Sequence, residues 1–244
     1  MEFSEDGFLG GRIVARQLCE GFRSGTDAVM LAAAVFAKAG DDVLELGCGA
    51  GIASLCLAAR VPDCRITGVE ISPELIALAK GNARVNRSDN HVHFEQADVL
   101  QLPKHLQKSF DHVFCNPPFH QRTGEVSPNA DRARARSDRE GLVNWIKAGL
   151  ARVTAGGTLT AIMRADRLGE ALRAAPQEGT QIFPLWPRAG ALAKRVILQT
   201  EKNSRAPLRL AAGLILHDDD GRYTSQADAV LRDATSLALA NLRL

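Results

Sequence analysis

The amino-acid sequence predicts an α/β fold, with helices on both faces of a doubly wound, mostly parallel sheet. Two observations support this prediction. Short apolar segments alternate regularly with helical segments between residues 43 and 163, and this alternation is typical of parallel sheets. The first of these apolar segments also runs directly into a glycine-rich turn that opens a helix, as strands do at the ligand-binding edge of such a sheet.

Local patterns predict the individual elements. We expect strands at residues 43–46, 65–70, 91–96, 110–115 and 157–163, and helices at 28–36, 52–60, 74–86 and 139–153. Thr26 and Asp27 stand where a helix N-cap belongs, and Pro73 stands where the first turn of a helix tolerates it. Two further strands, at 181–185 and 195–199, flank a turn without a helix between them, so they should pair antiparallel.

The two ends of the chain depart from the alternating pattern. Residues 1–24 contain several glycines and arginines and predict a short arm or hairpin, whereas about 205–244 predicts a small extension with a helix at about 225–240. A length of 244 residues suits one α/β domain of the larger kind. We therefore expect residues 1–244 to form a single domain with these two additions.

The composition argues against several classes of protein. The net charge is only +2, so a local basic patch would be needed to attract nucleic acid. No apolar run approaches the ~20 residues that a membrane span requires. The five cysteines lack metal-ligand spacing, which favours a reducing cytoplasm and no metal site; they are Cys19, Cys48, Cys56, Cys64 and Cys115.

A glycine-rich loop, Gly47-Cys48-Gly49-Ala50-Gly51, joins the strand at 43–46 to the helix at 52–60. Its glycines permit a tight turn and a close approach of ligand to backbone, and the helix N-terminus attracts a phosphate or a carboxylate. The dinucleotide fingerprint Gly-x-Gly-x-x-Gly would need glycine at position 52, where Ile52 stands. This departure disfavours a nicotinamide-dependent dehydrogenase.

Two acidic residues stand at the ends of the next two predicted strands. Glu70 ends the strand at 65–70, where a carboxylate can accept hydrogen bonds from both hydroxyls of a ribose. Asp98 follows the strand at 91–96. Either acid alone could be a solvated strand end, but the loop and both acids occur in the order that a nucleoside-like ligand requires.

The tetrapeptide Asn116-Pro117-Pro118-Phe119 follows the strand at 110–115. Two prolines stiffen the turn, and the Asn116 side-chain oxygen and the Pro117 carbonyl can accept both N–H groups of a planar amine. This contact favours a tetrahedral nitrogen whose lone pair can attack a methyl group. Phe119 offers a face for stacking the substrate. The alternative interpretation is a rigid turn with a packed phenylalanine.

These motifs resemble those of known enzymes. The loop at 47–51, preceded by Glu45, resembles the first motif of class I S-adenosylmethionine (SAM)-dependent methyltransferases, and Asn-Pro-Pro-Phe resembles those that modify amino groups of adenine, guanine or glutamine. The resemblance implies a Rossmann-like seven-stranded sheet with an antiparallel final strand, and SAM as cofactor. The implied catalytic residues are Asn116, Pro117, Pro118 and Phe119. The implied cofactor-binding residues are Thr26, Asp27, Glu45, Gly47, Cys48, Gly49, Gly51, Glu70, Ile71, Asp98, Val99 and Asn116.

The segment Gly25-Thr26-Asp27 is similar to one in bacterial tRNA adenine-N6 methyltransferases that act on valine tRNA, which implies a tRNA substrate. Alternatives remain. His120 after Phe119 is also found in rRNA guanine-N2 methyltransferases, which usually carry a second domain. Glutamine-N5 methyltransferases typically have tyrosine at the fourth position of the motif and a separate N-terminal helical domain. A catalytically silent module that binds SAM or RNA would not need to keep the intact tetrapeptide.

Basic residues near the tetrapeptide are candidates for RNA contacts, because arginine and lysine meet backbone phosphates. The alternative is a solvated surface on which the arginines pair with neighbouring acids. The expected RNA-binding residues are Arg122, Arg132, Arg134, Arg136, Lys194 and Arg195.

Overall fold

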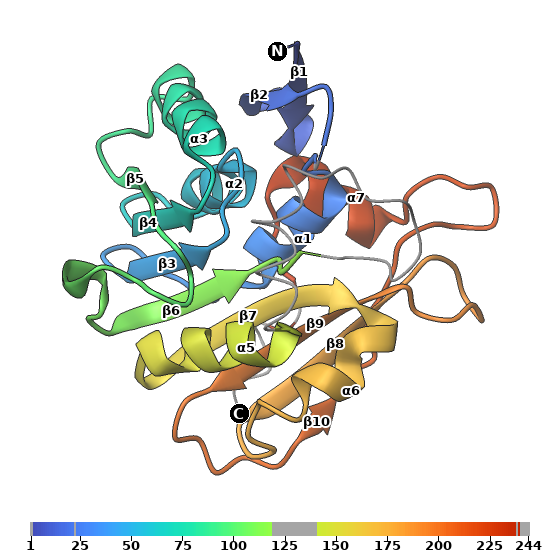
Figure 1. Cartoon of the computed structure of the whole chain (residues 1–244). Helices are drawn as coiled ribbons and strands as arrows, with labels where there is room; N and C mark the ends of the chain where they lie inside the picture. Colours follow the sequence, from blue (N-terminus) through green and yellow to red (C-terminus); the bar gives the residue numbers. More distant parts are fainter. Residues whose placement is uncertain (1, 22, 119–140, 238, 240–244) are drawn as a thin grey trace, which may run out of the picture.

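A computed structural model describes residues 2–21, 23–118, 141–237 and 239 of the chain. Within these residues the chain folds around a nine-stranded sheet with the order β10-β8-β9-β7-β6-β3-β4-β5, in which β11 also pairs with β8 (Figure 1). The strands are β3 (Asp42–Leu46), β4 (Arg65–Glu70), β5 (Val92–Gln96), β6 (Phe110–Cys115), β7 (Val153–Arg164), β8 (Thr180–Trp186), β9 (Arg195–Glu201), β10 (Arg209–Leu210) and β11 (Leu214–Ile215).

The sheet confirms the predicted fold class. Strands β5, β4, β3, β6 and β7 run parallel in that order, and β8 pairs antiparallel with β9 as the sequence predicts. The predicted number of seven strands is too low, because the two-residue strands β10 and β11 add to the outer edge of β8. Among the seven longer strands described in this sheet, β9 is the last along the chain and pairs antiparallel with both β7 and β8, which agrees with the implied antiparallel final strand.

Helices cover both faces of the sheet (Figure 1). One face carries α1 (Thr26–Ala34), α2 (Ile52–Arg60), α3 (Pro73–Val85) and α7 (Ser225–Asp233), and the other carries α5 (Gly141–Arg152) and the short α6 (Leu168–Ala171). Two buried apolar clusters correspond to these two faces; Leu31 and Ile52 belong to one, and Phe110 and Ile146 to the other. Among the described helices, none has the length and apolarity needed to cross a membrane.

The helix ends have local causes. Ser72 caps α3 by accepting a hydrogen bond from the Leu75 amide at 3.2 Å, and Pro73 follows it in the first turn. Helix α7 is shorter than the predicted 225–240, because Ala234 adopts a left-handed conformation and ends the helix at Asp233. The expected cap by Thr26 or Asp27 is also wrong: α1 begins at Thr26, after Gly25, whose position has no side-chain cap.

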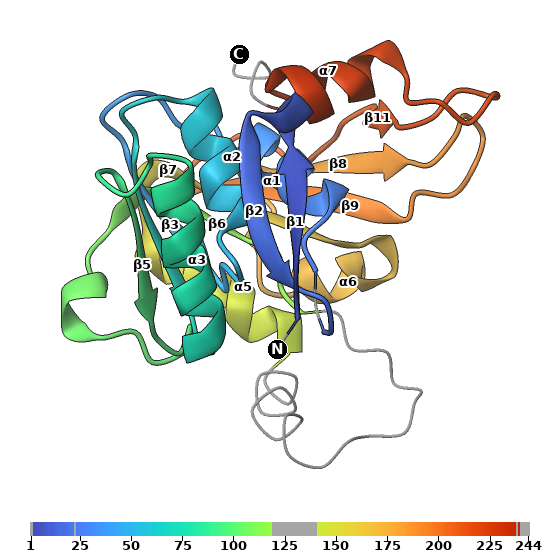
Figure 2. The same ribbon diagram turned by 90° about the horizontal axis from the view of Figure 1, so that it is seen from above.

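The N-terminal residues form a hairpin beside the sheet. Strands β1 (Phe3–Phe8) and β2 (Ile13–Leu18) pair antiparallel, and a 3-10 turn, η1 (Leu9–Gly11), joins them. Figure 2 shows the hairpin standing beside α3 and close to α1 and α2. At the other end of the chain, the Leu237 amide donates to the Ala33 carbonyl of α1 at 2.9 Å, so both terminal regions pack against the same layer of helices.

Candidate active site

The candidate site lies at the edge where the parallel strands end. Because β3, β4, β5 and β6 are parallel neighbours, the residues that follow them meet at one edge: Gly47, Ile71, Asp98 and Asn116. The antiparallel strand β9 begins at this edge, since Arg195 pairs with Arg164 at the end of β7. The topology therefore gathers most of the sequence-predicted site residues in one place.

Asp27 reaches this edge through an ion pair. Its carboxylate accepts a hydrogen bond of 2.7 Å from Nε of Arg195, which lies 168 positions away in the sequence. The contact places the start of α1 beside the start of β9. It also gives Arg195, an expected RNA contact, a protein partner, whereas Lys194 next to it is exposed.

The glycine loop has a different steric requirement at each glycine. Gly47, Gly49 and Gly51 have φ angles of +69°, +54° and +84°, a region that favours glycine. A Cβ on Gly47 would lie 2.6 Å from the ring of Trp145, and one on Gly51 would lie 2.5 Å from the ring of Phe94. A Cβ on Gly49 would meet no described atom within 4 Å. Gly47 and Gly51 thus allow close packing, while Gly49 faces open space.

Glu70 connects the glycine loop to the turn after β4. Its Oε2 atom accepts a hydrogen bond from the Gly49 amide at 3.2 Å, and its Oε1 atom accepts bonds from the amides of Ile71 and Ser72 at 2.9 and 3.1 Å. Both carboxylate oxygens are therefore held in place by backbone. The Ile71 side chain is 48% exposed beside them and presents an apolar surface at the site.

Asp98 is held in a similar way after β5. Its Oδ1 atom accepts a hydrogen bond from the Leu100 amide at 2.9 Å. Val99, the neighbouring expected residue, is 8% exposed and packs in the apolar cluster under α5. Two fixed acids thus follow adjacent strands, as a ligand with several hydroxyl or amino groups requires.

Glu45 is buried beneath the glycine loop. Its carboxylate accepts hydrogen bonds from the amide and the hydroxyl of Ser54 in the first turn of α2, the amide at 3.1 Å. Burial raises the pKa of Glu45 to about 8, so the side chain is largely protonated at neutral pH. These contacts support the start of α2, and a direct contact with a cofactor stays a prediction. Ser54 gave no signal in the sequence analysis.

Cys48 lies in the same loop and is buried. Burial raises the pKa of its thiol well above the ordinary value, with Glu45 and Glu70 acting in the same direction. The thiol therefore stays neutral and lines the loop as a small apolar group.

Asn116 follows β6, and its side-chain oxygen is the atom of the site that most directly indicates a ligand contact. Its side-chain Oδ1 is buried and has no hydrogen-bond partner among the described residues. A buried acceptor without a partner costs free energy, of roughly 1–3 kcal/mol, unless a ligand supplies the missing donor. The observation is the one expected of a group that receives an N–H from substrate.

The turn after Asn116 is tied to the segment after β7. The Pro118 carbonyl accepts a hydrogen bond of 3.2 Å from Nη1 of Arg167, in the 3-10 turn η3 (Ala165–Arg167). Arg167 also pairs with Glu170 at 3.0 Å, and Glu170 accepts a bond from the Leu142 amide of α5 at 2.8 Å. The sequence analysis did not assign these two residues to the site, because the pair joins segments that are far apart in the chain.

Five of the expected site residues lie outside the described part of the chain, namely Phe119, Arg122, Arg132, Arg134 and Arg136. The described part contains no group of three or more His, Cys, Asp or Glu side chains arranged to hold a metal ion.

The site fits the cofactor that its motifs imply. SAM carries a charged amino-acid end, a ribose with two hydroxyls and an adenine. The open position at Gly49, the start of α2 and the two fixed acids offer space, backbone donors and acceptors for these groups. A family model described as a methyltransferase domain matches residues 37–137, which include the glycine loop, both acids and Asn116. Fold and site together define the chain as a Rossmann-like, SAM-dependent methyltransferase.

Individual relatives are more specific. The chain is 25% identical to the tRNA1(Val) (adenine(37)-N6)-methyltransferase of Haemophilus influenzae strain Rd, over 86% of this chain and 89% of the relative. It is 28% identical to the enzyme of the same name from Mannheimia succiniciproducens, over 86% of each chain. Among solved structures, a predicted O-methyltransferase from Agrobacterium tumefaciens matches with a TM-score of 0.71 and 26% identity, over 86% of this chain and 98% of that chain.

Proposed function

We propose that this protein methylates the N6 amino group of an adenine in a tRNA. The observation that carries the proposal is the buried Oδ1 of Asn116 at the end of β6, which has no hydrogen-bond partner within the described part of the chain. The relatives named above, which are described as acting on adenine 37 of tRNA1(Val), support the same substrate class. We also propose that residues 1–244 act as one domain in the cytoplasm, where tRNA is found.

SAM supplies an electrophilic methyl group when it is bound. In our proposal the loop glycines Gly47, Gly49 and Gly51 receive its amino-acid end, and Glu70 accepts from the ribose hydroxyls. Asp98 accepts from the adenine amino group of the cofactor. The remaining proposed cofactor-binding residues are Thr26, Asp27, Glu45, Cys48, Ile71 and Val99.

Asn116 orients the substrate amine in this proposal. Its Oδ1 accepts one N–H of the adenine N6 amino group, and the Pro117 carbonyl accepts the other. These two bonds favour a more tetrahedral nitrogen, whose lone pair would attack the methyl carbon while the bond from that carbon to sulfur breaks. S-adenosylhomocysteine would be the leaving group, and the methylated nitrogen would then lose one proton. Because the acceptors stand in place before the reaction, catalysis needs little rearrangement of the protein. Phe119, outside the described residues, would stack on the adenine ring.

Basic residues around the site would hold the tRNA backbone. Lys194 is exposed at the active edge, and the arginines at positions 122, 132, 134 and 136 follow the catalytic turn in sequence. Replacing Arg132, Arg134 and Arg136 together by alanine should weaken tRNA binding and lower its salt dependence, with unchanged SAM affinity. An unaltered salt dependence would instead indicate a solvated surface.

The decisive experiment measures catalysis and cofactor binding separately. The protein is incubated with labelled SAM and, in separate reactions, with tRNA, rRNA and protein, and the methylated nucleoside is identified after digestion. We expect N6-methyladenosine from tRNA alone. Asn116→Ala should lower turnover by a factor on the order of a hundred or more, while SAM affinity, measured by calorimetry, stays within about two- to threefold of the unmodified protein. A near-normal rate in this variant would contradict the proposed role of Asn116.

A further inference from the structure

The N-terminal hairpin is attached to α3 by two asparagine side chains. Asn82 accepts a hydrogen bond from the Arg16 amide at 2.8 Å and donates to the Arg16 carbonyl at 3.0 Å. Asn86, one turn later, accepts from the Val14 amide at 3.0 Å and donates to the Val14 carbonyl at 2.7 Å. Each asparagine amide thus satisfies both backbone groups of one residue in β2.

This attachment is possible because residues four apart in a helix and residues two apart in a strand are separated by nearly the same distance. Residues four apart in a helix are separated by about 6 Å along its axis. Residues two apart in a strand are separated by about 6.6 Å. Asn82 in α3 and Asn86, the residue that caps its C-terminus, are four apart, and Val14 and Arg16 are two apart in β2. One edge of β2 is paired with β1, and in the described structure the two asparagine side chains take the place of a strand on the other edge.

Only Asn82 extends this attachment to the cofactor loop. Its Nδ2 atom donates a second hydrogen bond, of 2.9 Å, to the carbonyl of Ala50, between Gly49 and Gly51. The corresponding second bond of Asn86 goes to its own helix, at the Asn82 carbonyl, at 2.8 Å. Asn82 is 2% exposed, so water cannot easily take over its contacts if they are lost.

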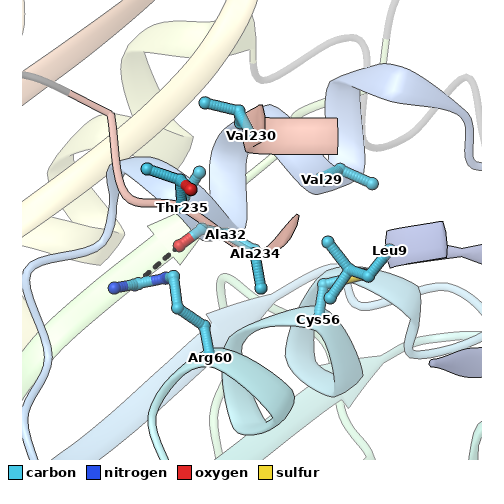
Figure 3. Close-up of a pocket in the computed structure, with 9 residues that line it drawn as sticks. Leu9, Val29, Ala32, Cys56, Arg60, Val230, Ala234 and Thr235 are labelled. Carbon is cyan, nitrogen blue, oxygen red and sulfur yellow. Dashed lines mark hydrogen bonds between the residues drawn. The ribbon is translucent and has the colours of Figure 1, made fainter. Parts of the chain in front are cut away.

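The turn of the hairpin is anchored independently. Leu9 of η1 lines a small apolar pocket with Val29 of α1, Cys56 of α2 and Val230 of α7 (Figure 3). Nearby, Nη1 of Arg12 donates to the Asp233 carbonyl at the end of α7 at 3.0 Å. Loss of one asparagine contact should therefore loosen β2 locally without releasing the whole hairpin.

We propose that Asn82 is a positioning residue through which the N-terminal hairpin holds the cofactor loop in its binding conformation. The Ala50 carbonyl lies in a turn with three left-handed glycines, and the Asn82 bond restricts this turn from α3, to which the hairpin is attached. Binding of the cofactor and order in β2 are then coupled, and the coupling is reciprocal. The inference rests on residues 47–51 binding the cofactor, so its test includes a measurement made without cofactor.

The experiment compares Asn82→Asp with the matched control Asn86→Asp in the full chain. Aspartate keeps the shape and the acceptor oxygen of each side chain but removes its donors, so both variants weaken the hairpin attachment and only Asn82→Asp loses the bond to Ala50. By calorimetry with S-adenosylhomocysteine, we expect Asn82→Asp to bind about tenfold more weakly and Asn86→Asp to bind within about twofold of the unmodified protein. Without cofactor, hydrogen exchange at the Gly51 amide should accelerate in Asn82→Asp alone.

Two results would overturn the inference. One is an equal loss of affinity in both variants, which would assign the effect to general loosening of the hairpin. The other is unaltered exchange at Gly51 in Asn82→Asp. If Asn82→Asp does not fold, hydrogen exchange is measured instead in the unmodified protein, with and without S-adenosylhomocysteine. The ligand should slow exchange at the Arg16 amide more than at the Val14 amide. Equal protection of the two amides would refute the coupling. Failure of the proposed function would appear differently, as absent methylation with the exchange pattern intact.

Discussion

Arg167 donates a hydrogen bond of 3.2 Å from Nη1 to the carbonyl oxygen of Pro118 and so holds the turn that follows Asn116 from the side of β7. The same guanidinium pairs with Glu170, whose carboxylate accepts from the Leu142 amide of α5. The pair thus fixes Pro118 relative to the start of α5. Since Asn116 lies two residues before Pro118, the position of its amide depends on this contact.

We expect Arg167→Ala to lower turnover by about tenfold or more, because small displacements of a positioned group are costly in catalysis. SAM affinity should change less than about threefold, since the hydrogen bonds of Arg167 go to Pro118 and Glu170 and so support the turn after Asn116. Steady-state kinetics and calorimetry measure the two effects. Asp166→Asn is the control, because Asp166 is the neighbour of Arg167 in the chain and forms an exposed ion pair with Arg164. Equal losses of turnover in both variants would contradict a specific role for Arg167.

The three loop glycines should differ in what their replacement costs. Gly47→Ala and Gly51→Ala should lower the melting temperature most, because each new Cβ would collide with an aromatic ring, that of Trp145 or of Phe94, in addition to straining the backbone. Gly49→Ala meets no described neighbour, so its main defect should be weaker SAM binding. Gly40→Ala is the control for backbone strain, since Gly40 has a φ of +87° and open space around its Cβ position. Thermal melts and calorimetry distinguish these outcomes, and normal SAM binding by Gly49→Ala would argue against ligand contact there.

Glu45 should make the stability of the protein depend on pH. Burial raises its pKa in the folded state to about 8, so below the ordinary pKa of a glutamate both folded and unfolded states are protonated and folding is not penalised. As pH rises towards 8, the unfolded chain ionises while the folded state resists, and stability falls. Glu45→Gln replaces the ionisable carboxyl group with a neutral amide, so this loss of stability with rising pH should disappear. Relative to the unmodified protein, it should gain on the order of 1–3 kcal/mol in unfolding free energy between pH 5 and pH 8, measured by denaturant unfolding. No such pH-dependent gain would refute the shifted pKa.

Thiol reactivity should separate Cys19 from the other four cysteines. Cys19 is exposed, whereas Cys48, Cys56, Cys64 and Cys115 are buried. Burial raises the pKa of each buried thiol, to about 11 for Cys64, so little thiolate forms at pH 8. A thiol-specific reagent should label Cys19 quickly in the native protein and all five cysteines after unfolding. Rapid labelling of Cys48, identified by mass spectrometry, would contradict the closed packing of the loop.

The sequence by itself determined the features that depend on local pattern. The alternation of strands and helices predicts the parallel sheet, since the spacing of apolar residues that distinguishes a strand from a helix can be recognised within a short stretch of consecutive residues. Glycines at 47, 49 and 51 predict the turn, because few other residues adopt left-handed conformations. Asn116 after a buried strand is placed by the same logic, since parallel strands end at a common edge.

Only the tertiary structure decided the features that depend on contacts between distant segments. The insertion of β9 between β7 and β8 brings Arg195 to Asp27, and no local pattern specifies that pairing. Asn82 reads in the sequence as an ordinary helix residue, yet its amide joins β2 to the Ala50 carbonyl. Arg167 likewise meets Pro118 only because β6 and β7 are neighbours. The physical reason is common to all three: a side chain's hydrogen-bond partner is chosen by which strands and helices pack together, and that packing arises from burial across the whole chain.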